Sequence, residues 1–243
     1  MEESYTGLSR AMFEQYLCAD GLPTAVSPGY EEADMPMDEL MQRDPRLRQT
    51  IDNPELPFKV LSDGTKQFNA LPIIDTKYCT TGYYVMKYHS TDPEQWNIGQ
   101  STLDVFIFRY AEVLLIKAEA ENELNGPTQT AYEAINQVRR RAYRHFPITA
   151  LSVHDLPAGL NQEEFRKRLQ QERFNEFILE GQRWFDLVRW RILVSTVSQE
   201  KTGITEKNYL FPIPASQITL NPNLKQNWGY DGETSGSPYA GYK

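Results

Sequence analysis

Apolar side chains recur with helical periodicity in several parts of the sequence, and these parts predict the main elements of the fold. A short helix is predicted over residues 9–18, where a Gly-Leu-Pro segment ends it. A longer helix is predicted over residues 106–124, because apolar residues recur at positions 107, 110, 111, 114, 115, 118 and 124. Gly126 and Pro127 end this run, since a glycine followed by a proline commonly closes a helix.

A second helix follows after a short connection and completes a predicted helical pair over residues 105–145. Thr130, with Glu133 three residues later, predicts a capping box at its start. Its apolar stripe consists of Ala131, Ala134, Ile135, Val138 and Ala142. Two helices joined in this way have the size of one tetratricopeptide-like (TPR-like) unit, and one unit cannot bury both of its faces. We therefore expect an apolar face that promotes self-association or binds a partner.

A third helical pattern spans residues 161–194, and Asn161 with Glu164 predicts its N-cap. Its apolar residues include Phe165, Leu169, Phe177, Ile178, Trp184, Phe185 and Val188. Gly181 lies in its middle, where glycine costs about 1 kcal/mol relative to alanine. Either another backbone approaches closely at this point, or the helix breaks into two.

The other segments lack sustained helical periodicity. Residues 20–104 contain many prolines and predict an irregular insert with short strands near 46–51, 67–74 and 83–88. An extended chain is predicted over 208–230, with a polyproline-like segment and a turn, and a flexible tail over 231–243. The chain is thus predicted to be one mainly α domain: a TPR-like hairpin, a long C-terminal helix, and an irregular segment with short β-strands.

Charge and composition narrow the class of protein. The 243 residues carry 25 basic and 33 acidic side chains, a net charge of −8, which disfavours nucleic acid as a partner. A mean hydropathy of −0.58 argues against a transmembrane helix. The start of the chain has neither the basic nor the apolar segment of a signal peptide, and Cys18 lacks the context of a lipidated cysteine.

Motifs for metal, cofactor or catalytic chemistry are missing from the sequence. His89, His145 and His154 lack metal-ligand spacing and are expected on the surface or in loops. No CxxC, GxGxxG, Walker glycine loop or GxSxG elbow occurs, so no cofactor, no metal and no catalytic residues are expected. Cys18 and Cys79 allow at most one disulfide, and their pairing is left open.

A dense polar cluster between residues 172 and 189 has two interpretations. Glu172 and Glu176, one helical turn apart, could form a carboxylate pair for a glycoside hydrolase. Neighbours on one helix face cannot easily flank a sugar, however, so an ion-paired helix is favoured. The pairs expected at i, i+3 spacing are Arg173–Glu176, Glu180–Arg183 and Asp186–Arg189.

Aromatic residues gather at Tyr78, Tyr83, Tyr84, Tyr88 and Trp96. Flat aromatic faces stack on sugar rings while polar neighbours bind the hydroxyls, and Trp96 beside Asn97 lies in such a polar setting. Residues 83–88 alternate as a strand does, which favours packing over sugar contact for Tyr83. The candidate carbohydrate-binding residues are Trp96, Tyr78, Tyr83 and Asn97.

Several motifs resemble those of the SusD/RagB family, in the expected order from about residue 43 to 230. They are Arg43-Asp44-Pro45-Arg46-Leu47, the segment from Phe108 to Leu115, Ile135-Asn136-Gln137-Val138-Arg139, the segment from Glu172 to Trp190, and Leu210-Phe211-Pro212-Ile213-Pro214. Residues that carry the signature and are expected to act as scaffold are Arg109, Glu112, Arg173, Glu176, Glu180, Arg183, Trp184 and Asp186.

This resemblance implies a SusD-like α/α superhelix and a role as a binding protein rather than an enzyme. Such proteins are surface-exposed outer-membrane lipoproteins of Bacteroidetes type, which capture oligo- or polysaccharides and act with a SusC-like TonB-dependent transporter. The chain resembles the C-terminal portion of such a protein, so an N-terminal TPR-like half is a further expected partner. The alternative is a TPR-like interaction scaffold with no direct sugar contact.

Overall fold

The computed structural model describes residues 7–33, 36–70, 79–97, 99–199, 201–234 and 236–237. Tertiary contacts divide the chain into unit 1, which ends at Glu180, and unit 2, which begins at Gly181. Unit 1 contains α1 (Arg10–Glu14), α2 (Pro36–Leu40), α3 (Pro45–Thr50), β1 (Lys59–Val60), β2 (Lys66–Gln67), the 3-10 helix η1 (Pro93–Trp96), α4 (Tyr110–Asn125), α5 (Gln129–Ala142) and α6 (Gln162–Glu176). Unit 2 contains α7 (Gln182–Arg189), α8 (Leu193–Val197), the 3-10 helix η2 (Glu206–Tyr209) and α9 (Ala215–Leu220).

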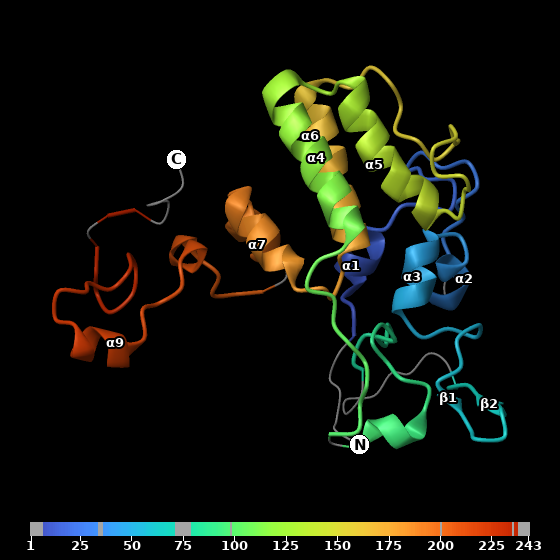
Figure 1. Ribbon diagram of the computed structural model, residues 1–243, viewed down its shortest axis with the longest axis horizontal. Coiled ribbons are helices and arrows are strands. Elements are labelled where there is room, and N and C mark those ends of the chain that lie inside the picture. Colours follow the sequence, from blue (N-terminus) through green and yellow to red (C-terminus); the bar gives the residue numbers. More distant parts are fainter. Residues whose placement is uncertain are drawn as a thin grey trace. The chain divides into compact units, whose positions relative to one another are not determined.

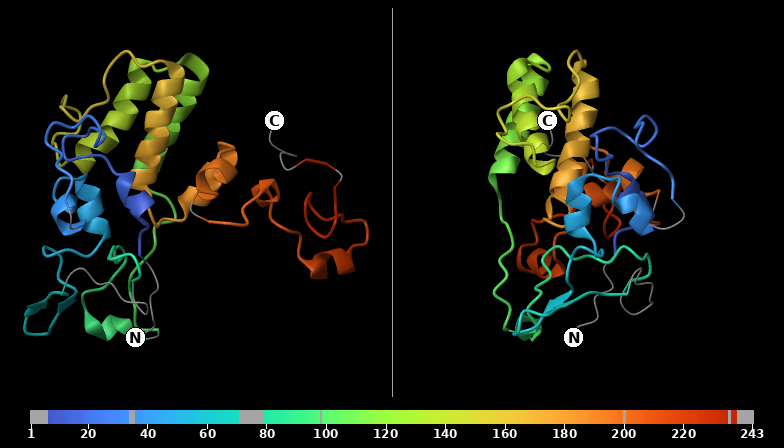
Figure 2. Two further views of the ribbon diagram at one scale, coloured as in Figure 1. Left: turned by 180° about the vertical axis from the view of Figure 1, so that it is seen from behind. Right: turned by 90° about the vertical axis from the view of Figure 1, so that its right-hand side faces the viewer.

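Helices α4, α5 and α6 lie side by side in unit 1 (Figure 1), and the reverse view shows the same arrangement (Figure 2). Leu115 of α4, Ile135 of α5 and Phe165 of α6 are completely buried, as the apolar spacing of these helices requires. The predicted TPR-like pair is confirmed, and Gly126 closes α4 with a positive φ of 80°. The cap of α5 is Thr128, which accepts from the Ala131 amide, so the box predicted at Thr130 is wrong by two residues.

The predicted helix over 161–194 begins as expected but is not continuous. Asn161 and Glu164 form a reciprocal capping box at the start of α6. The chain then leaves the helix after Glu176, and Gly181 takes a left-handed φ of 77° before α7 begins. Apart from its chain neighbours, no heavy atom of the described residues lies within 4 Å of the position that a Cβ at Gly181 would occupy. Gly181 therefore allows the chain to break between α6 and α7, and the alternative prediction of a closely approaching backbone is wrong.

Three predictions for the irregular insert need correction. Residues 46–51 are not a strand: Asp44 accepts from the Arg46 amide and Pro45 occupies the first turn, which together start helix α3. The predicted strand 67–74 shrinks to β2, which pairs with β1 so that Lys59 faces Gln67, while residues 71–78 lie outside the described residues. In 83–88 only single bridges form, from Tyr84 and Val85.

Apolar clusters hold the described segments of each unit. One cluster of unit 1 consists of Leu8, Phe13, Tyr16, Leu40, Leu47, Ile51, Tyr83, Phe174 and Ile178. A cluster of unit 2 consists of Leu187, Val188, Leu193 and Tyr209. Unit 2 also corrects the prediction of an extended chain after residue 200, because η2 and α9 form there.

Candidate functional site

Trp96 lies at the end of η1 and belongs to a half-buried aromatic cluster with Phe58 and His89. Its ring centroid is 5.4 Å from that of Phe58 and 5.6 Å from that of His89, and Phe58 and His89 stack at 4.6 Å. The indole Nε1 donates to the Ser90 carbonyl at 2.7 Å, and the Lys59 ammonium lies 5.7 Å from the indole centroid. These contacts fix the plane of the indole while leaving part of it exposed to solvent.

The polar neighbours that the sequence predicts are present around this cluster. Asn97 is exposed, and its amide donates to the Glu94 carbonyl at 3.4 Å. Gln95 accepts from the Thr102 hydroxyl at 3.1 Å. The setting thus combines an oriented aromatic ring with exposed amide and carboxylate groups, a composition that suits a hydroxylated ligand.

Tyr83, another aromatic candidate, is not part of this cluster. Tyr83 is buried in the core of unit 1, where it stacks on Phe13 at 4.6 Å and its hydroxyl accepts from Arg10. This position favours the packing alternative for Tyr83. Tyr78 lies outside the described residues.

Arg46 on α3 is the centre of a buried ion network in unit 1. Its guanidinium contacts Asp44 at 2.6 Å, Glu172 at 2.7 Å and Glu176 at 2.8 Å. The second oxygen of Glu172 binds Arg139 of α5 at 3.0 Å. These charges are buried together, and each has an opposite partner, so the network ties α3, α5 and α6 to one another.

Further cations bind the carboxylates at the end of α6. Glu176 accepts from Arg109 and Arg141 through the oxygen that Arg46 does not use. Glu180 accepts from Arg109 at 2.8 Å and from Lys87 at 2.6 Å. The pair Asp186–Arg189, expected at i, i+3 spacing, is confirmed in unit 2 at 2.8 Å. Glu176 and Glu180 bind the cations named above, which lie far from them in the sequence.

This network decides between the two interpretations of the polar cluster. All four carboxylate oxygens of Glu172 and Glu176 bind arginine. Burial alone would raise the pKa of Glu176, but Arg46, Arg141 and Arg109 outweigh it and hold that pKa below its ordinary value. A general acid requires a raised pKa and access to substrate. The structure therefore supports the ion-paired helix rather than a catalytic carboxylate pair.

The remaining signature residues have packing positions. Arg173 is buried, and its guanidinium lies 5.1 Å from the centre of the Phe177 ring. In unit 2 Trp184 packs on the apolar cluster, with its ring 6.0 Å from that of Phe211, and Asp186 is buried. Glu112 and Arg183 are half-buried, on α4 and α7 respectively.

The histidines and cysteines do not form a metal or disulfide site in the part of the chain that the structure describes. His89, His145 and His154 lie outside the helices and strands, as the sequence predicts, and are half-buried. His89 belongs to the aromatic cluster, and His154 stacks on Tyr143 at 4.2 Å. Cys18 and Cys79 are both buried free thiols. Among the described residues, no group of His, Cys, Asp and Glu is arranged to hold a metal ion, and no helix has the length and apolar character needed to cross a membrane.

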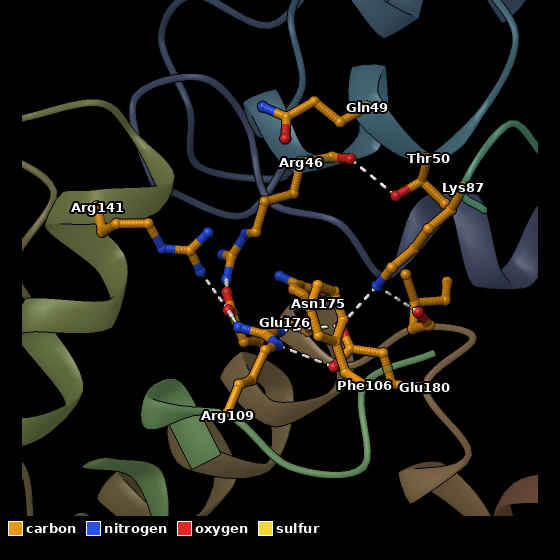
Figure 3. A pocket seen from close by; sticks show the side chains of 11 residues that line it. Arg46, Gln49, Thr50, Lys87, Phe106, Arg109, Arg141, Asn175, Glu176 and Glu180 are labelled. Carbon is orange, nitrogen blue, oxygen red and sulfur yellow. Dashed lines mark hydrogen bonds and ion pairs between the residues drawn. The ribbon is translucent and has the colours of Figure 1, made fainter. Parts of the chain in front are cut away.

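A pocket of about 340 Å³ opens beside the ion network (Figure 3). The residues that line it are Arg46, Gln49, Thr50, Lys87, Phe106, Arg109, Arg141, Asn175, Glu176, Ile178 and Glu180. All of them belong to unit 1. The pocket shares no lining residue with the Trp96 cluster, so unit 1 presents two separate candidate sites.

Comparison with known proteins now identifies the class. The sequence profile of the SusD family matches residues 4–208 and 193–230, and the chain belongs to this family. It is 34% identical over 149 residues to a SusD-like protein of Formosa agariphila, a match that covers 60% of this chain and 28% of that protein. It is 27% identical over 162 residues to the starch-binding protein SusD of Bacteroides thetaiotaomicron, covering 62% of this chain and 26% of the relative.

Solved structures support the fold. A SusD-like protein of Bacteroides fragilis superposes with a TM-score of 0.70 at 24% identity, over 92% of this chain and 47% of that one. The predicted mainly α, SusD-like fold is thereby confirmed. The chain spans just over a quarter of the length of each of these two curated relatives and about half of this structural neighbour.

Lowered carboxylate pKa values predict an acid-sensitive fold. The pKa values of Glu39, Asp44 and Glu176 lie below their ordinary values: burial opposes the shift, and the neighbouring arginines outweigh burial. These groups stabilise the fold above their unfolded pKa values, near 4, and this stability is lost as pH falls through the lowered folded values. Burial raises the pKa of Asp52, so this group has the opposite effect on stability in acid. It is outweighed by the three carboxylates whose pKa values are lowered. Burial also lowers the pKa of His154, so a smaller loss of stability begins below its unfolded value of 6.5. We expect the main fall of the urea midpoint below about pH 4.

The matched control for this pH series is a repeat in 0.5 M NaCl. Salt screens exposed charges but affects buried pairs far less, so the loss in acid should persist. A urea midpoint that stays unchanged down to pH 3 would contradict the assignment of these three buried carboxylates as charged partners.

Proposed function

We propose that this chain is a portion of a non-catalytic glycan-binding subunit of a SusC/SusD-type uptake system. In this role the protein lies at the surface of the outer membrane, captures oligosaccharide, and passes it to a TonB-dependent transporter. Family membership supports the proposal, as does the name of the starch-binding relative. The network at Glu172 and Glu176 supports a role without catalysis, because arginines occupy those carboxylates.

The observation that carries the glycan assignment is the oriented, partly exposed indole of Trp96. A sugar ring presents C–H groups on its face, and these pack on an aromatic ring while its hydroxyls need hydrogen-bond partners. The Ser90 hydrogen bond and the Phe58–His89 stack hold the indole in one position before ligand arrives. A preorganised ring loses little conformational freedom on binding, which favours affinity. Asn97, the next residue in the sequence, is exposed and carries an amide group that can bind a hydroxyl.

Trp96→Ala should weaken glycan binding by about tenfold or more, since a well-packed tryptophan anchor commonly contributes that much. The measurement is affinity electrophoresis or calorimetry of the 243-residue chain against a panel of soluble polysaccharides. The control is Trp228→Ala, which removes a half-buried tryptophan of unit 2. Equal binding by Trp96→Ala and the parent chain to a recognised glycan would refute the Trp96 site.

A second candidate function is a TPR-like interaction scaffold without sugar contact. The observation in its favour is the exposed apolar side of α4, where Tyr110, Val113, Ile116 and Leu124 are between 52% and 80% exposed. The N-terminal TPR-like half of the same protein and the transporter are the partners that would cover it. Copurification of the transporter that Trp96→Ala leaves unchanged, with no glycan bound by the full-length protein, would favour this candidate over the first.

A further inference from the structure

The pocket beside the ion network contains a buried donor that the fold leaves unused. Asn175 of α6 is only 1% exposed and lines the pocket. Its side-chain oxygen accepts from Gln171 at 3.0 Å, but its amide nitrogen has no hydrogen-bond partner among the described residues. Leaving such a group unpaired is costly, so an unpaired donor on a residue that lines a pocket points to a ligand acceptor. Figure 3 shows Asn175 among the side chains that surround this space.

Other unused donors surround the same space. Arg141 is 44% exposed and uses one nitrogen to bind Glu176. The Lys87 ammonium donates to the Ile178 carbonyl and to Glu180. One of its three N–H groups is therefore available to a ligand. Gln49 is exposed at the rim. The carboxylates of the pocket, in contrast, are already paired, because Glu176 and Glu180 both bind arginine or lysine.

The charge of the lining selects the kind of acceptor. Arg46, Lys87, Arg109 and Arg141 face only two carboxylates in the pocket wall, so the lining carries an excess positive charge. Asp44, Glu172 and Arg139 belong to the same network but do not line the pocket. When these three residues are included, cations still outnumber anions by one. A ligand oxyanion would balance this excess and would receive the unused N–H groups.

Size and shape restrict the ligand further. The volume of about 340 Å³ is at the lower end of small-molecule sites, which suits one sugar-sized ring. Phe106, 55% exposed, and Ile178 supply apolar surface for the face of such a ring. We propose that this pocket binds the carboxylate of a uronate, an acidic sugar residue, with Asn175 and Arg141 donating to its oxygens.

The test is calorimetry or ligand-observed NMR on the 243-residue chain with sodium D-glucuronate, D-glucose and sodium acetate at equal ionic strength. We expect glucuronate to bind at least about tenfold more tightly than the other two, because charged hydrogen bonds contribute most. Arg141→Gln and Asn175→Asp should each weaken glucuronate binding by about tenfold or more. Arg144→Gln, an exposed arginine three residues after Arg141 that does not line the pocket, is the matched control and should change nothing.

The outcomes separate this site from the Trp96 site. Trp96→Ala should leave glucuronate binding unchanged, so loss of polysaccharide binding in that variant does not bear on the pocket. If circular dichroism shows that Asn175→Asp does not fold, the Arg141→Gln variant tests the proposal in its place, because the Arg141 side chain is partly exposed. Equal affinity for glucuronate and glucose overturns the proposal, as does equal affinity for acetate, which would mean an adventitious anion site only. Unchanged binding in Arg141→Gln overturns it as well.

Discussion

Replacing Glu176 by Gln is expected to lower the free energy of unfolding by about 3–5 kcal/mol, because the change leaves buried charges without their partner. The side chain of Glu176 is completely buried and binds Arg46, Arg109 and Arg141. Gln has nearly the same shape, so the loss comes from charge rather than from a cavity. Urea unfolding at pH 7, followed by circular dichroism, measures it directly.

The matched control is Glu163→Gln on the same helix. Glu163 pairs with Lys167 at 2.7 Å, but both side chains are about 70% exposed. An exposed pair of this kind contributes little to stability, because water screens its charges, so Glu163→Gln should leave the unfolding midpoint nearly unchanged. A Glu176→Gln variant as stable as Glu163→Gln would show that the buried network does not hold α3 and α6 together. Reducing sugar released by the parent chain and lost in Glu176→Gln would instead revive the glycoside hydrolase interpretation.

Phe165→Ala should lower the free energy of unfolding by about 3–5 kcal/mol through the cavity it leaves. Phe165 is completely buried in α6, and its ring meets that of Tyr132 on α5 edge to face, with 5.1 Å between centroids. This contact joins α6 to the TPR-like pair of α4 and α5. The measurement is the midpoint of urea unfolding together with the slope of the transition.

Phe146→Ala provides the comparison, since Phe146 is 67% exposed and its removal should cost less than about 0.5 kcal/mol. If Phe165→Ala were as mild as Phe146→Ala, α6 would not pack on α5 as described. A steep loss confined to Phe165→Ala would establish the three-helix layer as the stable part of unit 1.

Elements whose signals are local could be predicted from the sequence. The start of α6 follows from Asn161 and Glu164, which cap each other across three residues. The TPR-like pair follows from apolar spacing and from Gly126 at the end of α4. Local signals were also misread: Asp44-Pro45 is a helix start, yet the irregular sequence around it suggested a strand.

The sites depend on contacts that no local pattern contains. Arg46 and Glu172 lie 126 residues apart in sequence, and Arg109 and Glu176 lie 67 apart, so i, i+3 spacing assigned the glutamates to nearer partners. Trp96 was identified from its polar surroundings, but Phe58 and His89 beside it were not, because nothing in the sequence between them indicates the stack. Asn175 carries no sequence signal: its unused donor is visible only when its surroundings are known.

The long sequence separation within the Arg46 network has a consequence for the order in which the protein can form. To form the network, the chain must bring Arg46 of α3 to Glu172 and Glu176 of α6, which lie 126 and 130 residues away in the sequence. Closing a loop of that length costs conformational entropy, and contacts between distant residues slow folding. Until the loop closes, α3 lacks the carboxylates that anchor it to α6. We therefore expect the docking of α3 on α6 to be a late step in the folding of unit 1.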